Sequence, residues 1–111
     1  TRRASGEKLA GYWEFPGGKI EAFESPQECI VRELSEELDL VVTAEEIVAS
    51  STYEYPEGAI ELIAIECKVT DLNIKLTVHD AYEFLEPTRL LDINLAPADI
   101  EIAKKVAIRY G

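Results

Sequence analysis

Apolar and polar positions follow a helical period in the stretch that begins at Ser25. Ser25, Pro26 and Glu28 form a helix-start pattern: a capping serine, a proline at the first helical position and a glutamate three residues after the cap. Four apolar residues fall on one face at 100° per residue, beside a face that carries Cys29 and three glutamates. The apolar four are Ile30, Val31, Leu34 and Leu38. The pattern predicts an amphipathic helix that ends between Leu38 and Leu40.

Short β-type runs dominate most of the remaining chain. Residues 13–18 read WEFPGG, which predicts a short strand followed by a tight turn. Two β-rich runs flank residues 56–58, as in a hairpin, and further short strands are expected at 73–78 and 82–85. Residues 97–110 are helical in pattern again, as expected for a single α/β (α+β) domain. The side chains predicted to be buried in this last helix are Ile100, Ala103, Val106 and Ala107.

The charge composition limits the classes of partner that the protein can bind. The chain has 111 residues with 22 acidic and 11 basic side chains, a net charge of −11, so nucleic acids and anionic membranes are repelled. Cys29 and Cys67 lie among apolar residues, and free thiols in a cytoplasmic protein are favoured over a disulfide. The sequence contains no methionine and starts at Thr1, so we expect an N-terminally truncated chain whose natural form is longer.

Three glutamates of the predicted helix form an acidic cluster. Glu33, Glu36 and Glu37 stand at positions i, i+3 and i+4, so their side chains share one small volume, and only Arg32 offers local neutralisation. Mg²⁺ or Mn²⁺, which prefer oxygen ligands, are candidate partners, while the alternative is a solvated acidic face. The Gly17-Gly18 turn upstream lets backbone approach a ligand closely, and this favours the metal site.

The same stretch resembles the signature of the Nudix hydrolases. The positions in register are Gly18, Glu24, Arg32, Glu33, Leu34, Glu36, Glu37 and Leu40. Asp39 departs from the pattern, because the family has glycine there. Outside the signature, the segments EFPGGKIE, YEYP and LAPADI resemble the MutT-type branch. The resemblance implies a Nudix fold, an α/β/α sandwich with a mixed β-sheet whose first strands would precede Thr1.

The resemblance also implies roles for the signature residues. Glu33, Glu36 and Glu37 would hold Mg²⁺ or Mn²⁺ together with the Gly17 carbonyl, and Glu36 or Glu33 would orient or deprotonate the attacking water. Glu24 and Arg32 would bind each other or the loop backbone and keep the glutamates in place, although Arg32 contacting phosphate is an alternative.

Candidate substrate contacts lie outside the signature. By resemblance Asp99, at the start of the last helix, would hydrogen-bond a nucleobase edge; otherwise it is an acid favoured by the helix dipole. Phe15 and Tyr55 would stack on a base or belong to the core. Arg2 and Arg3 are candidate phosphate contacts or solvated side chains.

Two departures from the family pattern allow a rival function. Asp39 replaces a glycine in a left-handed position, which aspartate tolerates. Val78 stands where MutT-type enzymes carry a distant metal-binding glutamate, with Asp80 or Glu83 as possible substitutes. His79, the single histidine, is expected to be solvated. The rival is a catalytically weak nucleotide-binding or regulatory module.

The activity implied by the resemblance is metal-dependent pyrophosphohydrolysis of a small nucleotide substrate. A nucleoside triphosphate such as 8-oxo-dGTP or CTP would give the monophosphate and pyrophosphate. The sequence leaves the base, the sugar and the oligomeric state open.

Overall fold

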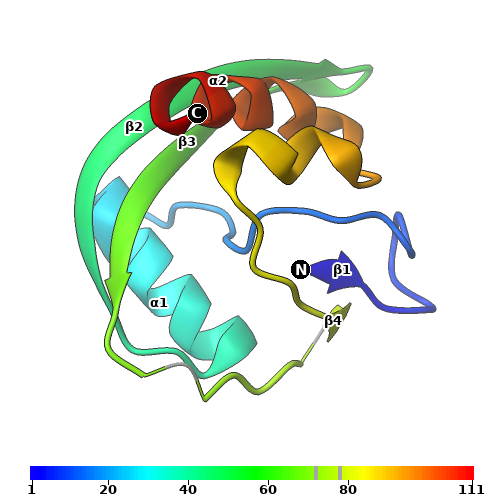
Figure 1. Ribbon diagram of the computed structural model, residues 1–111. Helices are drawn as coiled ribbons and strands as arrows, with labels where there is room; N and C mark the ends of the chain where they lie inside the picture. The colour runs from blue at the N-terminus through cyan, green and yellow to red at the C-terminus, as the bar shows by residue number, and fades with distance from the viewer. Residues whose placement is uncertain (72, 78) are drawn as a thin grey trace.

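The computed structural model describes residues 1–71, 73–77 and 79–111, and the Val78 prediction therefore lies outside the described residues. In chain order the elements are β1 (Arg2–Arg3), α1 (Pro26–Leu38), β2 (Val42–Tyr55), β3 (Gly58–Val69), β4 (His79–Ala81), the 3-10 helices η1 (Pro87–Asp92) and η2 (Pro97–Asp99), and α2 (Ile100–Tyr110). A long β2–β3 hairpin curves over both α-helices (Figure 1).

Helix α1 begins and ends as its sequence predicts. The Ser25 side chain accepts a hydrogen bond from the Glu28 backbone N–H at 3.0 Å, and Glu28 Oε1 accepts one from the Ser25 N–H at 2.9 Å. This reciprocal pair satisfies two of the free N–H groups at the helix start. Asp39 closes the helix in the left-handed conformation, with φ 53° and ψ 35°.

The β2–β3 hairpin supplies the surface against which the signature helix packs. Tyr55 pairs with Gly58 across a two-residue turn, which confirms the predicted hairpin. Half-buried apolar residues surround a small core. Its buried members are Leu34, Leu38, Leu40 and Val42. The core therefore fixes the apolar side of α1 against β2. The acidic side of α1 faces away from this core.

Several of the predicted short strands are wrong. The described strands form two antiparallel pairs, β2–β3 and β1–β4. Trp13 makes only isolated bridges, antiparallel to Arg2 and parallel to Leu95, so residues 13–18 are not a strand. Residues 73–77 and 82–85 also contain no strand, and pairing begins instead at His79. Ile74 and Leu76 pack against the core without a neighbouring strand to bond, whereas Tyr82 and Phe84 are exposed.

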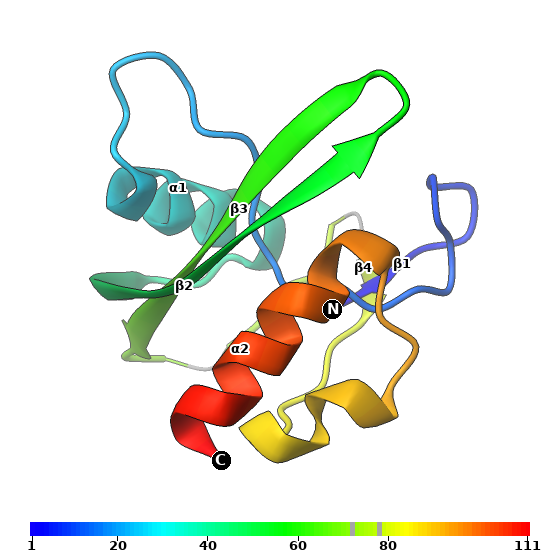
Figure 2. The same ribbon diagram turned by 90° about the horizontal axis from the view of Figure 1, so that it is seen from above.

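Helix α2 confirms the predicted C-terminal helix with a shifted buried face. Ile102 and Ala103 are buried, whereas Ile100 is 37% exposed, so the prediction that Ile100 is buried is wrong. The buried face is shifted because residues 97–99 form a 3-10 turn, so the α-helical spacing of side chains begins only after this turn. Seen from above, η1 lies beside α2 (Figure 2).

The two cysteines and the helices can be compared with the predictions made from composition. Cys29 is buried and Cys67 half-buried, and both are free thiols, as expected. No described helix combines the length and apolar character needed to cross a bilayer.

Candidate functional site

Arg32 is the centre of the ion-pair network on the acidic side of α1. Its guanidinium donates to Glu24 through Nε at 2.7 Å and Nη2 at 3.0 Å, a two-pronged pair. Nη1 donates to Glu33 at 2.8 Å and to Glu36 at 3.2 Å, and Nη2 also reaches the Lys19 carbonyl at 3.1 Å. Arg32 thus connects the loop before the helix to two members of the acidic cluster.

Glu24 has the structural contacts expected of it. Besides binding Arg32, its Oε1 accepts a hydrogen bond from the Glu21 backbone N–H at 3.0 Å. The Arg32 hydrogen bonds, followed by that backbone bond, lower the pKa of Glu24 to about 2. Glu24 is therefore ionised at any physiological pH and keeps Arg32 fixed.

Gly18 packs directly against the Glu33 carboxylate. A Cβ on Gly18 would overlap the carboxylate carbon and oxygens of Glu33. Gly17, next to it, has φ 152°, a backbone conformation that side chains rarely adopt. The Gly-Gly turn is therefore required by a close approach of loop backbone to the acidic cluster.

Glu37 is the least neutralised member of the cluster. Its side chain is 15% exposed, and burial, followed by the adjacent Glu33 carboxylate, raises its pKa to about 8. Glu14 adds to the same effect from outside the helix. Glu36 differs, because its side chain is 60% exposed. The cluster therefore combines one solvent-facing carboxylate with two carboxylates that are largely shielded from water.

His79 and Glu14 were missed as site residues by sequence reasoning. The prediction of a solvated His79 is wrong: its side chain is 0% exposed, and its Nε2 lies 2.7 Å from Glu14 Oε2. Nδ1 lies 3.7 Å from Glu37 Oε2. A glutamate between two aromatic residues, Trp13 and Phe15, was the available signal for Glu14.

Asp99 lies beside the WEFPGG loop. Its Oδ2 accepts a hydrogen bond from the Phe15 backbone N–H at 3.0 Å. Burial raises the pKa of Asp99 to about 6, although the Phe15 bond opposes this. The Asp99 charge also contributes to raising the pKa of Tyr55, after burial and Tyr53. The hydrogen bond therefore brings together two candidate substrate contacts, Asp99 and Phe15, that are 84 positions apart in sequence.

Arg2 and Arg3 are already engaged by acidic or aromatic partners. Arg2 Nε donates to Asp80 at 2.7 Å, and its guanidinium lies over the Trp13 ring at 5.6 Å. Arg3 donates through Nη1 to Glu14 at 3.2 Å and through Nε to the Lys8 carbonyl at 2.9 Å. A phosphate at either arginine would compete with these contacts. Asp80, a suggested substitute for the distant acid, is held by Arg2.

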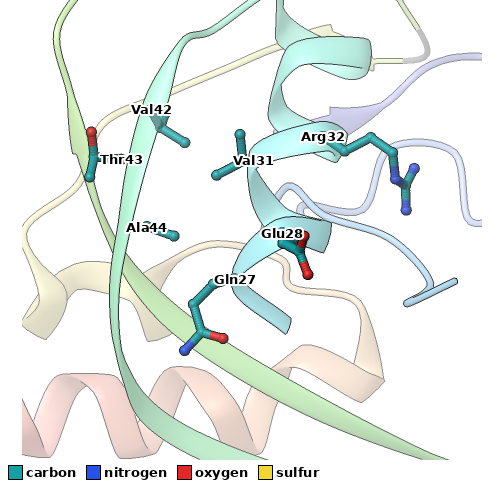
Figure 3. A pocket seen from close by; sticks show the side chains of 7 residues that line it. All are labelled: Gln27, Glu28, Val31, Arg32, Val42, Thr43 and Ala44. Carbon is teal, nitrogen blue, oxygen red and sulfur yellow. The ribbon is translucent and has the colours of Figure 1, made fainter. Parts of the chain in front are cut away.

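One hollow of the described surface lies on the apolar side of α1, and Arg32 stands at its edge. It measures about 500 Å³ and is formed where α1 meets β2, by residues that include Val31, Val42 and Ala44. Figure 3 shows the Arg32 guanidinium directed away from these apolar side chains. A second, mainly apolar cavity of about 300 Å³ includes Glu14 and Phe15, so it adjoins the loop that contacts Asp99.

A divalent cation fits the chemistry of the acidic cluster. The cluster offers only carboxylate oxygens, which are the ligands that Mg²⁺ and Mn²⁺ prefer, and Arg32 is paired with two of its members, Glu33 and Glu36. Within residues 1–71, 73–77 and 79–111, no three His, Cys, Asp or Glu side chains are already grouped as ligands of one ion. A cation bound at Glu33 or Glu36 would compete with Arg32 for the same carboxylate.

Comparison with known proteins identifies the class. The NUDIX domain family matches residues 1–106, and the chain therefore belongs to the Nudix family and is a Nudix hydrolase. The match confirms the family and fold predicted from the signature.

Characterised relatives cover different shares of the chain. It is 38% identical over 102 residues to the CTP pyrophosphohydrolase of Escherichia coli (strain K12), covering 92% of this chain and 76% of that protein. It is 42% identical over 62 residues to the 8-oxo-dGTP diphosphatase of the same organism, covering 56% of this chain and 48% of that protein.

Solved structures agree with the fold. The solution structure of the E. coli ORF135 protein matches with a TM-score of 0.81 and 38% identity, covering 97% of this chain and 78% of that one. The MutT protein from Methanosarcina mazei Go1 matches with a TM-score of 0.83 and covers 97% of this chain and 80% of that one. At 23% identity it supports the fold alone.

Proposed function

We propose that this Nudix hydrolase cleaves nucleoside triphosphates to the monophosphate and pyrophosphate, with Mg²⁺ or Mn²⁺ as cofactor. The observation that carries the proposal is the contact of Gly18 with the Glu33 carboxylate, in a cluster that Arg32 ties to Glu24. This packing supports a metal-binding role over a solvated acidic face, because a solvated face needs no glycine against a carboxylate.

Glu33, Glu36, Glu37 and the Gly17 carbonyl are the proposed ligands. A bound divalent ion would neutralise phosphate charge and make water more acidic. Glu36 is the better candidate to orient or deprotonate the attacking water, since its carboxylate is the exposed member of the cluster. Glu33 is the less favoured candidate, because Arg32 and Gly18 surround it. Arg32 keeps Glu33 and Glu36 in place between catalytic events.

Asp99 is the proposed reader of the base. One oxygen is bonded to the Phe15 N–H, which leaves acceptor capacity on the carboxylate for N–H donors of a base. The amino group of cytosine and the N–H edge of 8-oxoguanine both provide such donors, in line with the two named relatives. Phe15 and Tyr55 are proposed to flank the base. A cytoplasmic location is proposed on the basis of the two free thiols.

Pyrophosphate release from CTP, dCTP, 8-oxo-dGTP and UTP tests this assignment. Asp99→Asn retains an acceptor for the Phe15 N–H and removes the charge. We expect kcat/KM to fall about tenfold for the preferred triphosphate, because a charge-assisted hydrogen bond becomes neutral. The control, Asp92→Asn, removes the same charge from η1 and should match the wild type. Equal base preference in both variants would contradict base reading by Asp99.

A further inference from the structure

We propose that His79 is a positioning residue that holds Glu37 in the acidic cluster through Nδ1, while Glu14 fixes the imidazole ring from the opposite side. The proposal rests on the metal-dependent function proposed above and adds to it two residues outside the signature. It assigns His79 no contact with substrate.

The first step is the anchoring of the ring. His79 stands on β4 opposite Arg3 of β1, and its side chain is fully buried. Nε2 contacts Glu14 Oε2 at 2.7 Å, and the same oxygen receives Arg3 Nη1 at 3.2 Å. Glu14 is itself only 22% exposed. The ring orientation is therefore determined by a short bond to a carboxylate that Arg3 holds in place.

The second step is the unsatisfied nitrogen. His79 Nδ1 is buried and has no hydrogen-bond partner in the described structure. Buried polar atoms without partners are rare and costly, so one at a candidate site calls for a functional explanation. The acid facing it is Glu37, whose Oε2 is 3.7 Å away. A hydrogen bond requires about 2.7–3.2 Å, so the pair is one small side-chain movement short of bonding. In that bond Nδ1–H donates to the Glu37 carboxylate while Nε2–H donates to Glu14, so the bonded ring carries a hydrogen on both nitrogens.

The third step concerns what the contact does. Glu37 lies beside Glu33, and two adjacent carboxylates repel each other unless something holds them together. Among the described residues, Arg32 forms ion pairs with Glu33 and Glu36 and none with Glu37. His79 is thus the polar side chain placed to restrain Glu37, as partners of metal-binding carboxylates commonly do.

The single histidine allows a direct spectroscopic test on the unmutated protein. With ¹⁵N-histidine labelling, the two imidazole nitrogens of His79 are the only side-chain histidine signals. We expect saturating Mg²⁺ to move the Nδ1 resonance as the bond to Glu37 closes, while Nε2, already bonded to Glu14, changes little. An unchanged Nδ1 resonance in protein that binds Mg²⁺, as shown by backbone amide shifts, would overturn the proposal.

Two substitutions separate the two ring nitrogens. His79→Asn keeps a polar group near the position of Nδ1, and His79→Gln keeps one near Nε2. We expect Mn²⁺ affinity, measured by EPR of the free ion, to stay close to wild type in His79→Asn. In His79→Gln it should fall about tenfold or more, as for other lost partners of metal ligands. Equal Mn²⁺ affinities in the two folded variants would overturn the proposal.

The proposed function can fail separately. Absence of Mn²⁺ binding and of hydrolysis in the wild type would contradict the proposed function, and the positioning role with it. Wild-type binding and turnover with unchanged His79 signals would contradict the positioning role alone.

Discussion

Arg32 and Glu24 form a two-pronged ion pair, with Nε–Oε2 at 2.7 Å and Nη2–Oε1 at 3.0 Å. The pair joins the middle of α1 to the loop that follows the Gly-Gly turn. Because Nη1 of the same guanidinium holds Glu33 and Glu36, the loop and the acidic cluster share one support.

Replacing the Arg32 guanidinium by an ammonium group should break the connection between the loop and the acidic cluster. Arg32→Lys keeps the charge but cannot make two parallel bonds to Glu24 and still reach Glu33. We expect a fall in kcat of about tenfold or more, together with a lower melting temperature. Arg89→Lys is the matched control, because Arg89 pairs with Asp92 at an exposed site. Loss of activity equal in both variants would contradict a specific role for Arg32.

Gly18→Ala should displace a carboxylate without strain in the backbone. The added Cβ would overlap the Glu33 carboxylate, so Glu33 must move. We expect weaker Mn²⁺ binding in calorimetry and a loss of kcat of about tenfold or more, as for other disturbed metal ligands. Gly6→Ala is the control for a general loss of stability: its φ of 91° should strain the backbone, but nothing lies within 4 Å of its added Cβ, so we expect Mn²⁺ affinity to stay at the wild-type value. Unchanged Mn²⁺ affinity in Gly18→Ala would show that Glu33 is not a ligand.

The metal-free protein should lose stability as the pH rises from about 5 to 8. The pKa of Glu37 is about 8 in the folded chain, raised by burial and Glu33 from an ordinary value of 4.5. Between these values the folded state holds a proton that the unfolded state has released, so the free energy of unfolding falls with increasing pH.

Denaturation at several pH values measures this dependence. Glu37→Gln should show a flatter profile than the wild type, because it removes the group that titrates. Glu57→Gln, in the exposed hairpin turn, should retain the wild-type slope. Parallel profiles for Glu37→Gln and the wild type would contradict the raised pKa of Glu37.

Local signals explain which parts of the fold were predictable. The capping pattern at Ser25 and Glu28, and the turn before Gly58, involve residues within a few positions, so α1 and the hairpin followed from the sequence. The strand expected at 82–85 did not form: Tyr82 and Phe84 are exposed, so the alternation there marks no buried face, and an alternating pattern cannot supply a pairing partner.

The site was predictable where it follows the helix period or the family signature. Glu33, Glu36 and Glu37 were placed together by their spacing along α1. The contact of His79 with Glu14 joins residues 65 positions apart, and that of Phe15 with Asp99 joins residues 84 apart. Long-range contacts of this kind leave no periodic pattern, so His79 looked like a solvated loop residue.

The most direct test of the proposed chemistry is pyrophosphate release from CTP and 8-oxo-dGTP by the wild type and Glu36→Gln, each with and without Mg²⁺. Glu57→Gln controls for the lost charge. We expect turnover only with Mg²⁺, a fall of about a hundredfold or more in Glu36→Gln, as for loss of an acid–base group, and wild-type rates in Glu57→Gln. If the wild type binds these nucleotides in Mg²⁺ but releases no pyrophosphate, the result would contradict the proposed hydrolysis of nucleoside triphosphates. It would favour a nucleotide-binding module.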